Sequence, residues 1–327
     1  MKTKYLLFIL LFFITFEKAY GSCGSSSCPL YVFNPLSRGY FSLGLSYEYI
    51  YQNQIYVGSN KSFVGAIPEH HDEVSTLNQI TALTFGYTAF DFLRVDFVLP
   101  FIHREHSHIH NHEDEQLWEY WNFTGVGDAI LTGNFSVLSG DDDFLNINLN
   151  AGVKLPTGIT DVKNDEGEEA EVTIQPGTGS TDLIFGAAFS KNLASLQALS
   201  GELYSSFPVV LSVNYRLNGK GTDDYKFGNE LLLHLSTAYR FVEKISLLLQ
   251  VNARFMQHSD VGTTGEPEEN TGGKWIFLSP GLKFYLSDDI SLYSYLQLPV
   301  YQNVNGIQQT APYNLKFGIN KELNVLD

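Results

Sequence analysis

The chain consists mainly of segments in which hydrophobic and polar residues alternate. Segment 144–155 shows this most clearly, because from position 145 onward Leu, Ile, Val and Ala fill the odd positions, while Asn, Gly and Lys fill the even ones. A period of two is typical of a β-strand with one apolar and one polar face. The segment is also about as long as a tilted strand must be to cross a bilayer.

Alternation of the same kind recurs along the chain and predicts an all-β protein, a transmembrane antiparallel up-and-down β-barrel of about twelve strands over residues 39–323. A closed barrel leaves no strand edge unpaired in lipid. The alternative is a soluble β-sandwich or lipocalin-like barrel, which would turn its apolar faces inward. The predicted strands are 39–52, 74–88, 92–105, 126–138, 144–155, 179–191, 204–217, 228–241, 244–258, 274–286, 289–303 and 311–322.

The connections between these strands alternate in length, as they do in outer-membrane barrels. The short ones lie at 89–91, 139–143, 242–243 and 287–288, and 192–203 is a longer exception on the same side. An even number of strands then places both chain ends on the short-turn, periplasmic side. The long, extracellular connections are 53–73, 104–125, 156–178, 218–227, 259–273 and 304–310.

Residues 1–21 have the features of a secretory signal peptide: a basic start, a short apolar run and a small-residue cleavage site. Residues 22–38 are then a short periplasmic segment that contains both cysteines of the chain, Cys23 and Cys28. In an exported protein such a pair predicts a disulfide. Lipid attachment at Cys23, or a metal role for the pair, is the weaker alternative.

The formal net charge of −16 argues against nucleic acid as a partner. Many acidic residues fall in predicted loops, at 141–143, 165–171 and 266–269. The 24 Phe and 19 Tyr suit the aromatic girdles of a barrel in a lipid bilayer. The expected partners are therefore the outer-membrane bilayer and a small solute.

Charged residues also occur on the polar parity of the strands, where they would line the lumen. They could form a salt-bridge network that fills a narrow barrel, or a selectivity lining, and the two are compatible. The predicted lumen-lining residues are Glu48, Arg94, Asp96, Asp128, Lys154, Asp182, Arg216, Glu230, Arg240, Arg254, Lys283 and Lys316.

Histidines are concentrated in two stretches, 70–71 and 103–112. A hairpin centred near Phe90 would pair residue i with residue 180 − i and bring His70 opposite His110. Neutral imidazoles grouped beside Asp72, Glu73, Glu113 and Asp114 suit Zn, Cu or Ni, and binding should weaken below about pH 6. The alternative is a polar loop without a ligand. The predicted metal ligands are His70, His71, His106, His108, His110 and His112.

Three short stretches carry a family resemblance: GVGD at 125–128, GVKLPTG at 152–158 and PGTGSTDLIFGAAFSK at 176–191. The chain resembles the outer-membrane transporter family named for the MetA pathway of phenol degradation. The resemblance implies a Gram-negative outer-membrane barrel, with passage of small hydrophobic or aromatic compounds as the expected function.

Catalytic motifs such as G-x-S-x-G, H-E-x-x-H and the phosphate-binding loop do not occur, so we expect no enzyme. The functional hypothesis is a channel for passive passage of a small solute, either a hydrophobic or aromatic compound or a metal ion. Its extracellular mouth would be rich in histidine. The alternative is a structural or surface-binding barrel that transports nothing.

Overall fold

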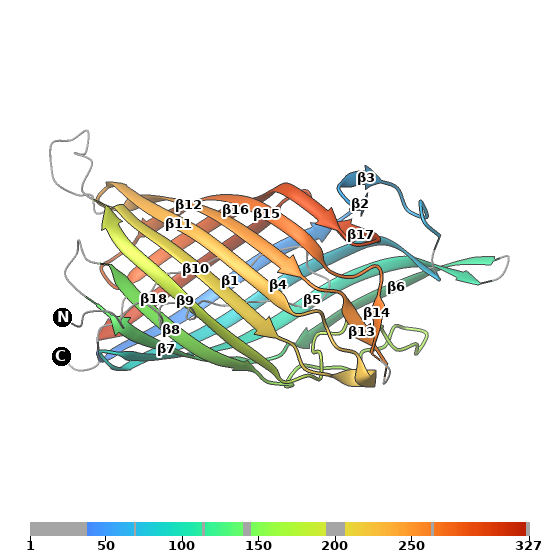
Figure 1. The fold of residues 1–327 in the computed structure, drawn as a ribbon, viewed down its shortest axis with the longest axis horizontal. Helices are drawn as coiled ribbons and strands as arrows, with labels where there is room; N and C mark the ends of the chain where they lie inside the picture. The colour runs from blue at the N-terminus through green and yellow to red at the C-terminus, as the bar shows by residue number, and fades with distance from the viewer. Residues whose placement is uncertain are drawn as a thin grey trace, which may run out of the picture.

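The computed structural model describes residues 38–68, 70–112, 115–139, 145–193, 207–262 and 265–324. Its wall is one closed antiparallel sheet with twelve strand positions, so the predicted fold class is confirmed (Figure 1). The wall strands are β1 Tyr40–Gln52, β4 His71–Phe90, β5 Leu93–His112, β6 Glu115–Val126 together with β7 Ile130–Leu138, β8 Asn146–Lys154, β9 Asp182–Leu193, β10 Phe207–Leu217, β11 Glu230–Val242, β12 Ile245–Met256, β15 Gly273–Tyr285, β16 Ile290–Val304 and β18 Asn314–Asn324.

The first and last wall strands close the barrel side by side, with Tyr40 paired to Asn324. Sequential strands pair with each other around the ring, which is an up-and-down topology. Within the part of the chain that the structure describes, no helix has the length and hydropathy needed to cross a membrane. The predicted signal peptide and the Cys23–Cys28 pair lie outside the described residues.

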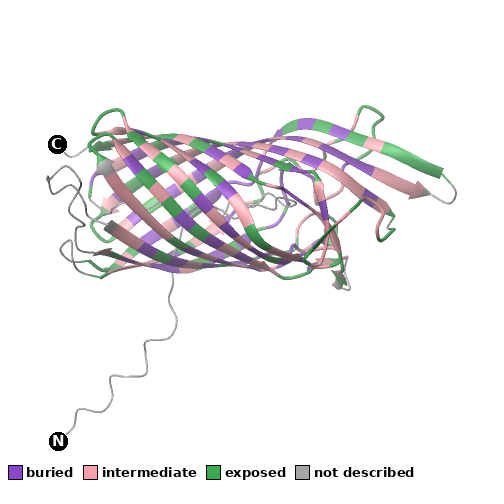
Figure 2. Ribbon diagram, turned by 90° about the horizontal axis from the view of Figure 1, so that it is seen from above, coloured by how far each residue is buried: buried purple, intermediate pink, exposed green. Residues whose placement is uncertain are grey.

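The outer surface of the wall carries an apolar belt. Leu45, Phe185 and Leu249 on three different strands are 45%, 47% and 43% exposed, although each belongs to the apolar parity of its strand. Figure 2 shows the alternation of buried and exposed residues along the strands. An apolar surface of this extent must face lipid. The soluble alternative, with this parity inward, is therefore wrong.

One predicted loop, 104–125, is wrong, because most of it is strand. β5 continues to His112 and pairs with β6, and the two strands extend beyond the barrel together with the start of β4 (Figures 1 and 2). β5 pairs with β7 nearer the short-turn end, so β6 and β7 share one position in the ring. The alternation of residue types does not indicate β6, because apolar residues occupy both of its faces: Trp121 and Phe123 are buried, whereas Trp118 and Tyr120 are exposed.

Small sheets occupy the same end of the barrel as the long connections. β2 Gln54–Val57 pairs with β3 Asn60–Ser62 and with β17 Ile307–Thr310, which joins the connection after β1 to the connection before β18. β13 Ser259–Val261 pairs with β14 Glu266–Glu268, and a 3-10 turn spans Thr222–Asp224. We call this end the mouth.

The apolar belt leads to the first prediction. Replacing Leu249 by Arg places a charge on the lipid face near the middle of β12 and should lower the free energy of unfolding by about 2–4 kcal/mol. The matched control is Val261→Arg, at a position 39% exposed on β13 outside the belt, where a change within about 0.5 kcal/mol is expected. Urea titration in lipid vesicles measures both, and equal losses would contradict the lipid-facing assignment.

Candidate functional site

Most of the predicted lumen-lining residues are buried on the inner face of the wall. Arg240 and Lys283 differ, because both are partly exposed near the short-turn end. The Arg240 guanidinium donates a hydrogen bond to the carbonyl of Glu243 and lies over the ring of Tyr285. The buried members are Glu48, Arg94, Asp96, Asp128, Lys154, Asp182, Arg216, Glu230, Arg254 and Lys316.

Several of these charges form ion pairs across the inner face, as the salt-bridge interpretation expects. The Lys154 ammonium is 2.8 Å from the Asp128 carboxylate and 3.0 Å from the Asp182 carboxylate. The other inner-face pairs are Arg94 with Asp96, Arg254 with Glu230 and Lys316 with Glu48. Pairing of this kind is what buried charges require.

The inner face is also less uniformly polar than the sequence pattern predicted. Apolar side chains form separate buried clusters on it, between the ion pairs. Among the described residues, these clusters are Ala82, Val98, Ile130 and Ile184; Ile50, Ile80, Ile102 and Ala311; Leu232, Trp275, Phe277 and Val304; and Ala188 with Val210.

The three stretches that carry the family resemblance meet at the Lys154 ammonium. Asp128 accepts hydrogen bonds from the backbone amides of Gly158 and Thr178, each at 2.9 Å. These bonds hold both ends of the connection between β8 and β9. We call residues 155–181 the inner segment, because they fold back against the inside of the wall instead of forming an outward loop.

The middle of the inner segment packs against the hairpin of β5 and β6. Ile174 lies in a buried cluster with Trp121 and Phe123 on the inner face of β6. The buried Arg104 guanidinium donates a hydrogen bond to the Ile174 carbonyl. This packing places Glu171 in contact with His71 on β4, 100 positions earlier in the chain.

The histidines lie where β4 and β5 rise above the apolar belt. On β5 the outward-facing residues are apolar up to Phe101 and polar at His103 and Glu105, so His106 and the residues after it lie outside the membrane-spanning part. The register pairs His71 with His110, and Glu73 with His108. The predicted pairing of His70 with His110 is wrong by one residue, although their Nε2 atoms are 3.2 Å apart.

Two of the predicted ligands are deeply enclosed, since His106 is 2% and His108 is 0% exposed. His71 and His110 are half-buried, and His70 is exposed. His112 ends β5 opposite Glu115, and its side chain lies outside the described residues. The structure therefore brings together five of the six predicted ligands, in a row that runs along the strands from the rim of the barrel inward.

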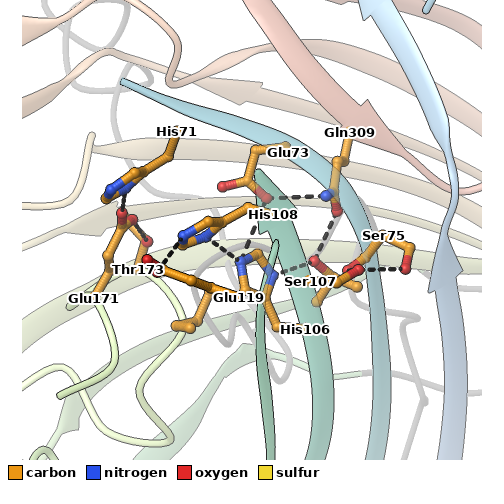
Figure 3. A network of polar contacts seen from close by, with 12 residues as sticks. His71, Glu73, Ser75, His106, Ser107, His108, Glu119, Glu171, Thr173 and Gln309 are labelled. Atoms are coloured by element: carbon orange, nitrogen blue, oxygen red, sulfur yellow. Dashed lines mark hydrogen bonds and ion pairs between the residues drawn. The ribbon is translucent and has the colours of Figure 1, made fainter. Parts of the chain in front are cut away.

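Carboxylates complete the cluster (Figure 3). Glu119 on β6 accepts hydrogen bonds from His108 Nε2 at 2.9 Å and from His110 Nδ1 at 2.8 Å. Glu73 Oε2 lies 3.6 Å from His106 Nε2. Sequence reasoning placed Glu73 near the histidines but missed Glu119 and Glu171, because one lies on the unrecognised strand and the other on a distant segment.

Three groups of these residues could each hold a metal ion, with all ligand atoms of a group within 4.8 Å of one another. Zn, Cu and Ni accept imidazole and carboxylate ligands of this kind. The groups are His70, His71 and His110; His71, His108 and Glu171; and Glu73, His106 and His108.

Burial keeps the two enclosed imidazoles neutral, and a neutral imidazole is the form that binds metals. Loss of hydration lowers the pKa of His106 to about 3 and also lowers the pKa of His108. Burial and the charge of Glu171 raise the pKa of Glu73 to about 8, although 36% of its side chain faces the cavity. The hydrogen bond to Glu171 raises the pKa of His71.

A cavity of about 710 Å³ opens beside these groups at the mouth. His71, Glu73, His106 and Glu171 contribute to its lining from the histidine side. The rest of the lining is partly apolar and aromatic, and includes Ile55, Tyr225, Phe227, Met256 and Trp275, with Arg254 beside Trp275.

The fold is similar to solved outer-membrane barrels. An outer membrane channel from Pseudomonas putida F1 is 13% identical, with a TM-score of 0.63 over 88% of this chain and 97% of that one. The transport unit of the autotransporter AIDA-I from Escherichia coli is 9% identical, with a TM-score of 0.49 over 89% and 93% of the two chains. No protein-family model and no curated protein sequence matches the chain. With its lipid-facing belt, the protein is a β-barrel of the outer membrane.

Proposed function

We propose that this protein is an outer-membrane channel for a small solute, and that its extracellular mouth binds a divalent transition-metal ion such as Zn, Cu or Ni. The observation that carries the proposal is the cluster of histidines and carboxylates beside the 710 Å³ cavity at the mouth. Because long connections face the outside in barrels of this type, the mouth is assigned to the cell exterior.

The chemistry of the cluster supports metal binding more than a plain polar loop. Enclosed imidazoles are costly to bury unless their nitrogens find partners. Here His106 and His108 are almost fully enclosed. One ring nitrogen of each faces the other histidine, the second nitrogen of His106 faces Thr76, and the second nitrogen of His108 faces Glu119. A divalent ion bound by a carboxylate and by the two nitrogens that face each other would give both of these nitrogens a ligand bond.

A second cargo, a small hydrophobic or aromatic compound, is favoured by the other side of the cavity. Trp275, Phe227 and Met256 offer it an apolar surface of the kind that binds such ligands. The barrel from Pseudomonas putida with the same fold is described as an outer membrane channel, which supports passage through this barrel as well.

Conductance across a planar bilayer tests the channel. We expect discrete conductance steps from the purified protein, and a change in step size when micromolar Zn is added to the side of the mouth, since the ion would add charge beside the cavity. A variant with His70, His71, His106, His108 and His110 changed to Ala should conduct without responding to Zn. The matched control, His258→Ala, alters an exposed histidine near the same end and should respond like the wild type.

A folded protein that shows no conductance steps and takes up neither ions nor small aromatic compounds into liposomes would contradict the channel. It would favour the alternative, a structural or surface-binding barrel. An equal Zn response from the five-histidine variant and the wild type would contradict the metal-binding mouth.

A further inference from the structure

We infer that the mouth holds two separate centres for divalent transition-metal ions, an outer one of His70, His71 and His110 and an inner one of Glu73, His106 and His108. The inference rests on the metal-binding mouth proposed above and deepens it. The two groups share no residue. The third group, His71, His108 and Glu171, lies between them and takes one histidine from each.

The positions on the hairpin separate the two centres along the strands. His71 pairs with His110 at the outer level, and Thr76 pairs with His106 at the inner level, four residues further down β5. Glu73 and His108 of the inner centre pair with each other two residues inward of His71 and His110, and the rings of His71 and His108 stack with centroids 4.4 Å apart. The two centres therefore lie next to each other along the hairpin. Burial follows the same order, from the exposed His70 to the enclosed His106 and His108.

Hydrogen bonds determine which nitrogens of the inner centre are left to bind an ion. The Gln309 amide donates to Glu73 Oε2 at 2.9 Å, so its carbonyl oxygen is the acceptor for the Thr76 hydroxyl at 2.7 Å. With its proton directed to Gln309, Thr76 must accept from His106 Nδ1 at 2.8 Å. His106 Nε2 therefore carries a lone pair.

In His108, the hydrogen bond to Glu119 likewise determines which ring nitrogen carries the lone pair. The ionised carboxylate can only accept, so His108 Nε2 must donate to it, and His108 Nδ1 carries the lone pair. His106 Nε2 and His108 Nδ1 are 3.2 Å apart with no proton between them. Two nitrogens bound to one tetrahedral Zn at about 2.0–2.1 Å lie about 3.3 Å apart, so the pair has the spacing of two ligands of one ion.

The outer centre is oriented by the other oxygen of the same carboxylate. His110 Nδ1 donates to Glu119 Oε1, which directs His110 Nε2 to within 3.2 Å of His70 Nε2. Again the spacing is that of two ligands of one ion. Glu119 is therefore a positioning residue for both centres: it binds neither ion but fixes one imidazole of each.

Zinc titration of the purified full-length protein by calorimetry tests the inference through the number of ions bound. We expect two per chain for the wild type. His70→Ala with His110→Ala should leave one, and Glu73→Gln with His106→Gln should also leave one. The control, His103→Ala with His258→Ala, changes two histidines outside the three groups and should keep two.

Glu119→Gln tests the positioning role. The two histidines donate to different carboxylate oxygens, and in glutamine one of these atoms becomes an NH2 group that cannot accept. The number of ions should therefore stay at two while the affinity of at least one centre falls about 10–100-fold. The absorption spectrum of bound Co(II) should also differ between the Glu119→Gln variant and the wild type. A purely structural role of Glu119 would not produce this spectral change.

One ion per chain in the wild type would overturn the two-centre inference and leave the metal-binding mouth standing. Loss of both ions in either double variant would also overturn it, because the centres would then not be separate. No binding at all would overturn both proposals. Two ions bound by a barrel that shows no conductance would support the centres and contradict only the channel.

Discussion

Replacing Lys154 by Met should lower the free energy of unfolding by about 3–5 kcal/mol, because it leaves two carboxylates buried without their cation. The Lys154 ammonium lies between Asp128 and Asp182, and all three residues are buried, with exposures of 2%, 6% and 2%. Methionine fills nearly the same volume, so the loss reports the charge and not a cavity. Urea unfolding in lipid vesicles measures it.

The matched control is Lys163→Met, which removes the ammonium facing Glu169 on the surface of the inner segment. That pair is 3.9 Å apart with both side chains more than half exposed, so a loss of no more than about 1 kcal/mol is expected. Changing Asp128 and Asp182 to Asn in the Lys154→Met background should restore part of the stability. Equal losses for the two lysine variants would contradict the central role of Lys154.

Replacing Gly158 by Val should displace the inner segment from the inside of the wall. A Cβ atom at Gly158 would lie 2.5 Å from the Cα atom of Gly177, so the two backbones leave no room for a side chain. Overpacking of this kind costs about 1–3 kcal/mol, and more where backbone must move. We expect a loss of stability in that range together with a larger single-channel conductance, because the segment lies beside the cavity.

Gly133→Ala is the control for that substitution, since a Cβ atom there meets nothing nearer than a side-chain carbon of Phe135 at 3.4 Å. Its stability should change by less than about 1 kcal/mol and its conductance should stay at the wild-type value. A Gly158→Val protein with wild-type stability and conductance would show that the close approach of the two glycines does not hold the segment.

The pairing register of β4 and β5 at the mouth could be determined only from the structure. Simple counting from the turn near Phe90 paired His70 with His110, whereas the ladder pairs His71 with His110. Irregularities lie between Thr88 and Phe90 and between Glu73 and Ser75, and each changes the count. A shift of this kind depends on local backbone geometry, which the alternation of residue types does not record.

The sequence by itself determined the barrel and the side of the wall on which most charges lie. Lipid and lumen impose opposite polarities on successive residues, so a period of two is visible wherever a strand separates them, as in β8. β6 lacks that period, because its inner face packs on the inner segment through Trp121 and Phe123. Only the tertiary structure decided that Glu119 and Glu171 join the histidines: the segment carrying Glu171 folds back across 100 positions of chain, and no local pattern encodes a contact of that range.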